Sequence, residues 1–94
     1  GTPAAIARLA ELLTEAGATA RPLSVRHAFH TRHADALLDD FAALVSATPM
    51  RPPAVPLVSS LTGRPLSAEE AMSPCYWARQ LREPVRFADA LRAL

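Results

Sequence analysis

The stretch LSVRHAFHTRHADALLDDFAALV, residues 23–45, decides the expected fold because it joins a strand pattern to the clearest helix pattern of the chain. Residues 19–25 are too few for a helix, contain Pro22 and place Leu23 and Val25 on one side, which is typical of a short strand. Beyond the histidines, apolar side chains recur at helical spacing, at Ala34, Leu37, Leu38, Phe41, Leu44 and Val45. We expect a strand, a histidine-rich loop and an amphipathic helix.

The residues before this stretch predict another helix. Thr2 can cap its N-terminus, Pro3 suits the first helical position, and Gly17 is a natural C-terminal stop. Between them, apolar residues recur at helical spacing, at Ile6, Leu9, Leu13 and Ala16. We expect a helix over residues 3–16.

The residues after position 45 predict one more strand and then helices. Prolines in the segment 49–53 end the preceding helix, and the apolar run 55–59 is predicted to be a short strand, followed by a turn at 63–65. Ser67 and Glu70 have capping-box spacing. Ser73 and the proline after it are predicted to start a helix through position 81, and a last helix is predicted from Pro84.

The order helix, strand, helix, strand and then helices favours an α/β architecture. Two short strands cannot make a stable sheet by themselves. The chain also begins and stops within helix patterns. We expect strands from a longer polypeptide to complete the sheet.

Composition excludes several classes of protein. The 94 residues allow one domain or part of one, and 50% hydrophobic and 20% charged residues are typical of soluble globular chains rather than disordered or membrane proteins. The net charge is +1 with the arginines spread along the chain, so neither nucleic acid nor membrane is an expected partner. A single cysteine, Cys75, and no visible secretory signal make a cytoplasmic location the default expectation.

His27, His30 and His33 lie where the predicted strand meets the strongest predicted helix. Loops at such junctions often carry reactive groups, and a neutral imidazole is a suitable general base. A surface or hydrogen-bonding role is nevertheless the more frequent one for a loop histidine. Spacings of three residues are not a recognised zinc pattern, so no metal site is expected.

Motifs occur in the correct order at residues 23–30, 55–65, 76–77 and 82–87, and together they resemble the acyltransferase domain of type I modular or iterative polyketide synthases. Residues 23–30 resemble its histidine motif, and residues 55–65 resemble the strand and turn that follow it. Tyr76-Trp77 and the segment 82–87 resemble its downstream signature. The resemblance covers nearly the whole chain.

This resemblance implies a division of the chain and a set of site residues. Residues 1–25 would be the end of a ferredoxin-like small subdomain, and residues 26–94 part of an α/β-hydrolase-like large subdomain. His30, the last histidine of the motif, would be the catalytic base. His27 would shape the substrate pocket, and Phe29 would favour a malonyl extender unit, because serine stands at this position in members that select methylmalonyl units.

The resemblance also implies a reaction. In the family, a serine in a Gly-His-Ser-x-Gly elbow attacks the thioester of an acyl-CoA, here malonyl-CoA. The acyl group then passes to the phosphopantetheine of an acyl carrier protein, and no cofactor is tightly bound. The implied partners are the remainder of the acyltransferase domain with its serine, the carrier protein and neighbouring synthase domains.

No such elbow occurs in these residues, so the chain alone is expected to be inactive. The alternative is a noncatalytic acyltransferase remnant that serves as a structural linker or docking piece in a synthase. The arginine that binds the extender carboxylate in the family would lie upstream, and the carbonyl that orients the histidine would lie beyond Leu94.

The chain departs from the family pattern at three positions, with Arg26 and Thr31 where serine is usual and Ser60 where asparagine is frequent. None of these removes the base. Four arginines could form a basic helical face for the carrier protein, although a solvated face is the more frequent outcome; they are Arg79, Arg82, Arg86 and Arg92.

Overall fold

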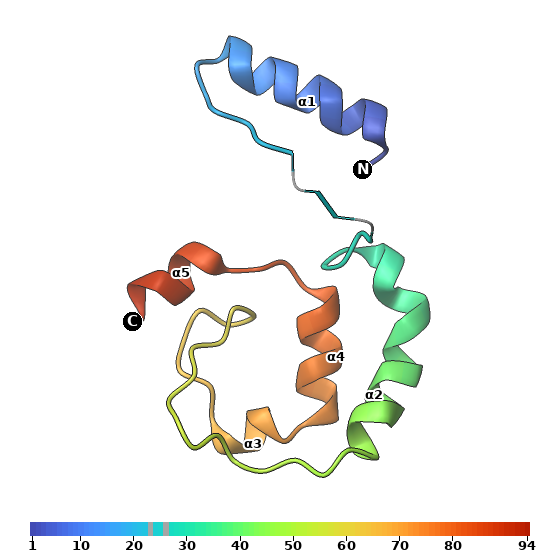
Figure 1. Ribbon diagram of the computed structural model, residues 1–94, viewed down its shortest axis with the longest axis vertical. Helices are drawn as coiled ribbons and strands as arrows, with labels where there is room; N and C mark the ends of the chain where they lie inside the picture. The colour runs from blue at the N-terminus through green and yellow to red at the C-terminus, as the bar shows by residue number, and fades with distance from the viewer. Residues whose placement is uncertain (23, 26) are drawn as a thin grey trace.

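The computed structural model describes residues 1–22, 24–25 and 27–94. These residues form helices joined by loops (Figure 1): α1 (Pro3–Glu15), the 3-10 helix η1 (Arg32–Leu37), α2 (Leu38–Ser46), α3 (Ala68–Ala71), α4 (Pro74–Arg82) and α5 (Phe87–Arg92). Helices α2 and α4 lie side by side and run antiparallel, and α4 also contacts η1 and α3. None of the helices described is long and apolar enough to cross a membrane.

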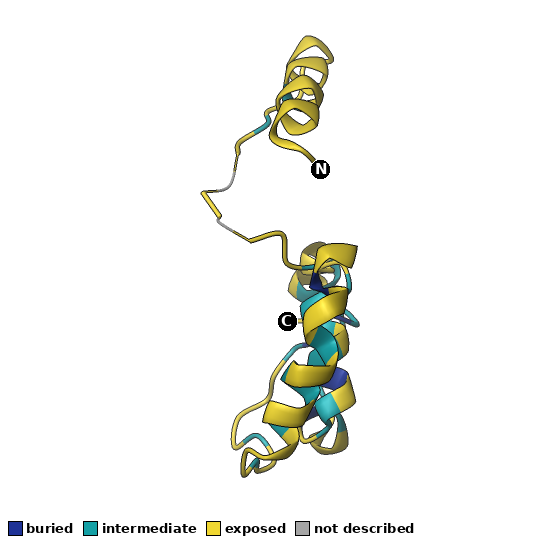
Figure 2. Cartoon of the chain, turned by 90° about the vertical axis from the view of Figure 1, so that its right-hand side faces the viewer, coloured by how far each residue is buried: buried dark blue, intermediate teal, exposed yellow. Residues whose placement is uncertain are grey.

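The predicted first helix is confirmed, together with both of its caps. The Thr2 hydroxyl accepts a hydrogen bond from the Ala5 N–H at 3.3 Å. At the other end, the Ala18 N–H donates to Leu13 O at 2.8 Å and the Gly17 N–H to Thr14 O at 3.0 Å, which is a Schellman motif. No residue of α1 is buried, and within the described residues α1 contacts no other helix (Figure 2).

The two strand predictions are wrong for the residues that the structure describes. None of the described residues in the segment 19–25 is in a strand, and Leu23 lies outside them. The segment 55–59 makes only an isolated antiparallel bridge between Val58 and Pro65. A strand extends only where a neighbour accepts and donates its backbone hydrogen bonds, and for the segment 55–59 that neighbour is limited to residues 64–66 of the following turn. The predicted sheet is therefore missing from this part of the chain.

The turn predicted at 63–65 is confirmed. The Gly63 N–H donates to Ser59 O at 2.8 Å, and Gly63 has a positive φ of 71°. The Ser59 N–H donates to Arg64 O at 2.9 Å, and the Leu66 N–H to Leu57 O at 2.8 Å. These bonds close the loop between α2 and α3.

The predicted central helix forms in two parts. Thr31 caps η1, because its hydroxyl accepts from the His33 N–H at 3.2 Å, and α2 continues from Leu38. The predicted starts of α3 and α4 are confirmed, with a full capping box between Ser67 and Glu70 in α3. The predicted start of the last helix at Pro84 is wrong. The Arg86 N–H instead donates to Ser60 O at 2.7 Å, and α5 begins at Phe87.

A small core forms where the Gly63 loop, residues 57–66, meets α4. The buried Ser59 hydroxyl accepts from the N–H groups of Leu61 and Thr62, both at 3.1 Å, which uses its two acceptor positions. Its own proton therefore goes to the hydroxyl of Tyr76 at 2.7 Å. Trp77 packs edge-on against Tyr76 and donates its indole N–H to Ala71 O at 2.8 Å. Both aromatic residues therefore have packing roles.

Candidate active site

His30 lies against the C-terminal end of α4. Its backbone N–H donates to Leu81 O at 2.9 Å, and its φ is 61°. A residue with a β-carbon rarely adopts this left-handed conformation, which costs about 1–2 kcal/mol. Such strain persists only where the surroundings hold it in place, and it is frequent at functional sites.

The ring of His30 is oriented by a main-chain carbonyl. Its Nδ1 lies 3.0 Å from Glu83 O, and the contact is partly buried. A carbonyl oxygen can only accept, so Nδ1 carries the proton. In the neutral ring, Nε2 then holds a free lone pair. This is the arrangement that a histidine needs to act as a general base.

Both acceptors come from the end of a helix. The last carbonyl groups of an α-helix have no partner within the helix. Leu81 lies in the last turn of α4, and Glu83 is its C-cap. The orienting carbonyl was expected beyond Leu94, and this expectation is wrong because Glu83 supplies it. Pro84 marks the helix end in the sequence. Nothing in the local sequence pattern indicates that the histidine loop, residues 27–31, lies against this helix end.

Thr31, the residue after His30, also stabilises this loop. Its hydroxyl donates to Ala28 O at 2.7 Å and accepts from the His33 N–H at 3.2 Å. A serine could make both bonds. The departure from the family pattern at this position therefore keeps the hydroxyl chemistry, whereas Arg26 lies outside the described residues.

An ion pair connects η1 to the end of α4. The Arg82 guanidinium binds the Asp35 carboxylate through Nε. Arg86 and Arg92 both pair with Asp89. Three of the four arginines considered for a basic face are therefore engaged with carboxylates, which weakens the case for a free cationic surface on these helices.

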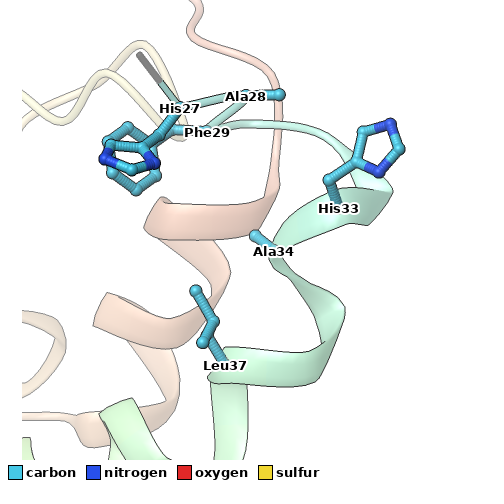
Figure 3. Close-up of a pocket in the computed structure, with 6 residues that line it drawn as sticks. All are labelled: His27, Ala28, Phe29, His33, Ala34 and Leu37. Atoms are coloured by element: carbon cyan, nitrogen blue, oxygen red, sulfur yellow. The ribbon is translucent and has the colours of Figure 1, made fainter.

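A cavity of about 390 Å³ lies beside the loop, within the usual range for small-molecule sites. Its lining consists of His27, Ala28, Phe29, His33, Ala34 and Leu37. The rings of His27 and Phe29 are 5.6 Å apart and tilted by 48°. Figure 3 shows these two rings next to each other, with the His33 ring directed away from both. His30 is adjacent in the chain but is not among the lining residues.

The three histidines do not converge on one point. His30 faces Glu83 O, whereas His27 and His33 point in different directions (Figure 3). Over residues 1–22, 24–25 and 27–94, the structure contains no group of three histidine, cysteine or carboxylate side chains that could hold a metal ion. The His30 ring is held by its own contact with Glu83 O, apart from the other two histidines.

Comparison with known proteins assigns the chain to a family. The sequence model of the protein family described as the acyl transferase domain matches residues 1–94. One component of the phenolphthiocerol/phthiocerol polyketide synthase of Mycobacterium tuberculosis (strain ATCC 25618 / H37Rv) is 43% identical over 86 residues, which are 92% of this chain and 6% of that protein. Polyketide synthase GfsA of Streptomyces halstedii is 42% identical over 94 residues, which are 100% of this chain and 1% of that protein.

Solved acyltransferase domains agree with this assignment. The acyltransferase domain of SpnD in complex with 2-(pent-4-yn-1-yl)malonyl is 33% identical, with a TM-score of 0.84 over 99% of this chain and 23% of that chain. The domain from the second module of the salinomycin polyketide synthase is 38% identical, with a TM-score of 0.77 over 99% and 21%. These relatives have an α/β fold, and the present chain spans about a fifth of each. The chain therefore belongs to the acyl transferase domain family, as a portion of the acyltransferase domain of a polyketide synthase.

Proposed function

We propose that His30 is the general base of a Ser-His dyad that loads an extender unit from acyl-CoA onto an acyl carrier protein. The observation that carries this proposal is the contact of His30 Nδ1 with Glu83 O, which leaves Nε2 free to accept a proton. The nucleophilic serine belongs to the part of the domain outside these 94 residues. Neighbouring synthase domains and the carrier protein are the proposed partners, and we place the reaction in the cytoplasm.

The proposed reaction has two halves, and in each half Nε2 takes up one proton and then releases it. In the first half, Nε2 takes the serine proton as the oxygen attacks the thioester, and the imidazolium then protonates the departing CoA thiolate. In the second half, Nε2 takes the proton of the phosphopantetheine thiol, which attacks the acyl-serine, and returns it to the serine oxygen. The partial negative charge at the C-terminal end of α4 suits a ring that becomes positive in each half.

The proposed substrate is malonyl-CoA. The Phe29 ring stands on the wall of the cavity beside His27, where a branched extender unit would meet a bulky aromatic group. One apolar contact of this kind discriminates by about 1–3 kcal/mol. Phe29 is therefore proposed to favour malonyl over methylmalonyl units without excluding the latter.

We also propose that the subdomain boundary lies near position 25. The separation of α1 from the other helices in the described residues supports this division. Residues 1–25 would belong to the ferredoxin-like subdomain and residues 26–94 to the larger α/β-hydrolase-like one.

The base assignment is tested by His30→Asn in the acyltransferase domain that contains this chain. Asparagine, like histidine, is among the residues that most often adopt a positive φ, so the loop can keep its shape while the base is removed. Serine acylation by malonyl-CoA, followed by mass spectrometry of the intact protein, should slow by about 100–10,000-fold. Asp40→Asn, on the exposed face of α2, is the control and should acylate normally. Undiminished acylation in His30→Asn would contradict the assignment.

The specificity proposal is tested by Phe29→Ser. Removal of the ring should raise the ratio of methylmalonyl to malonyl transfer by about 10–200-fold, mainly through a gain with methylmalonyl-CoA. The measurement is kcat/KM for both thioesters in competition. An unchanged ratio would show that Phe29 does not contact the extender branch.

A further inference from the structure

We infer that Arg82 is a positioning residue for His30, acting through its ion pair with Asp35. The inference rests on the proposed role of His30 as the base. Three consecutive residues at the end of α4 reach the histidine loop and η1. Leu81 and Glu83 offer their carbonyl oxygens to His30, and the side chain of Arg82, between them, binds Asp35.

The three contacts hold two segments together over a short span. On one side are residues 81–83, and on the other are His30 and Asp35, which are five residues apart. The two hydrogen bonds act on the backbone and ring of His30 itself, whereas the ion pair acts on η1, which follows the loop. The ion pair therefore fixes the distance between the loop and the helix end without touching the ring.

Helix α4 packs against α2 and η1, but the hydrogen bonds of its aromatic side chains lie in its first turn, away from residues 81–83. Tyr76 and Trp77 anchor the first turn through Ser59 and Ala71. Arg82 lies roughly 9 Å further along the helix axis, at 1.5 Å per residue. Beyond it, Val85 is exposed. Helix ends fray readily, and a typical hydrogen bond contributes only about 1 kcal/mol net.

The solvent exposure of the two side chains indicates that the ion pair affects catalysis more than global stability. The Arg82 and Asp35 side chains retain 33% and 56% of their accessible surface, and exposed pairs of this kind contribute little to global stability. Catalysis is more sensitive, because a displacement of about 1 Å at the reacting group can cost about 100-fold in rate. Loss of the pair should therefore reduce kcat while leaving the unfolding transition nearly unchanged.

The experiment is a double-mutant cycle in the acyltransferase domain that contains this chain, with Arg82→Gln, Asp35→Asn and both together. Serine acylation by malonyl-CoA without carrier protein is the readout, so that docking to the carrier cannot contribute. We expect each single variant to lose about 10–100-fold in kcat with KM retained, and the double variant to lose no more than either. Arg82→Lys, which keeps the charge, should recover part of the loss.

The matched control is Arg79→Gln, one turn earlier on α4. Arg79 is exposed and forms no ion pair within the described part of the chain, so this variant should retain full kcat. A second readout is the ring ¹⁵N spectrum of histidine-labelled protein, in which His30 is identified by comparison with His30→Asn. Arg82→Gln should shift the His30 signals from the form protonated only at Nδ1 towards a mixture of tautomers.

The outcomes separate the inference from the proposed function. If His30→Asn acylates normally, the proposed function fails and the inference fails with it. If His30→Asn is inactive but Arg82→Gln keeps its kcat and its ring spectrum, only the inference fails. A rise in KM specific to malonyl-CoA, with acetyl-CoA unaffected, would instead show that Arg82 binds the substrate carboxylate. A loss of kcat in Arg82→Gln that is accompanied by a corresponding fall in the melting temperature would show that Arg82 has only a structural role.

Discussion

At the scale of single residues, the backbone is left-handed at His30, Gly17 and Gly63. The two glycines differ in their surroundings. A β-carbon at Gly63 would lie 2.5 Å from the β-carbon of Asp89, whereas one at Gly17 would meet nothing within 4 Å. Glycine is therefore required at position 63 for its conformation and for its size, but at position 17 only for its conformation. His30 has the same type of backbone although it carries a side chain, since its conformation serves the contact with α4.

Alanine substitutions at the two glycines should separate these effects. Gly17→Ala should cost about 1–2 kcal/mol of local helix stability through its conformation. Gly63→Ala should cost about 2–4 kcal/mol, because the clash with Asp89 adds to the same strain. Urea unfolding of the domain monitored by circular dichroism measures the difference. Equal losses at the two positions would mean that α5 moves away freely from the Gly63 loop.

At the scale of elements, the short helix α3 depends on its cap. The Ser67 hydroxyl accepts from the Glu70 N–H, and the Glu70 carboxylate accepts from the Ser67 N–H, both at 3.1 Å. Arg64 adds a bidentate pair to the same carboxylate, at 2.6 and 3.2 Å. The hydrogen bonds from the Arg64 guanidinium, followed by the one from the Ser67 backbone, lower the pKa of Glu70. One carboxylate therefore ties the Gly63 loop to α3.

This lowered pKa predicts a pH dependence of stability. A carboxyl group whose pKa is lower in the folded state stabilises the fold above its ordinary pKa, and this contribution is lost as the pH falls through the lowered value. The difference in unfolding free energy between the wild type and Glu70→Gln should be present near neutral pH and disappear in acid. Glutamine can still accept from the Ser67 N–H, so the variant removes the charge but keeps the cap.

Urea unfolding at a series of pH values is the measurement. Glu69→Gln is the control, because Glu69 lies next to Glu70 but outside the capping box, and its profile should follow the wild type. Parallel profiles for the wild type and Glu70→Gln would contradict the prediction.

The elements that sequence patterns predicted correctly are those whose causes are local. Thr2, Ser67 and Ser73 each cap a helix within three residues, so the helix starts could be derived from neighbouring residues alone. The strands predicted near Val25 and Val58 depend on partner strands elsewhere in a polypeptide, and no local pattern supplies these. The start of α5 was misplaced for the same reason, because the bond from Arg86 to Ser60 spans 26 residues of sequence.

At the scale of the whole molecule, the site also combines features with local causes and features that depend on residues distant in the sequence. The motif around His30 could be identified from the sequence, and two of its residues, His27 and Phe29, line a cavity. The partner of His30 could not, since Glu83 is 53 residues away and contributes only a backbone atom. The ion pair between Arg82 and Asp35 could not be predicted from the sequence, because each residue lies among other charged residues.

The use of a main-chain oxygen to orient His30 has a consequence for the evolution of this domain. A side chain in that role could be erased by one codon change, whereas every amino acid at position 83 carries a carbonyl. Genetic drift at that codon can alter the charge and size of the residue and still leave the acceptor in place. Loss of the His30 orientation is therefore expected from point mutations that move the helix end rather than from substitutions at position 83.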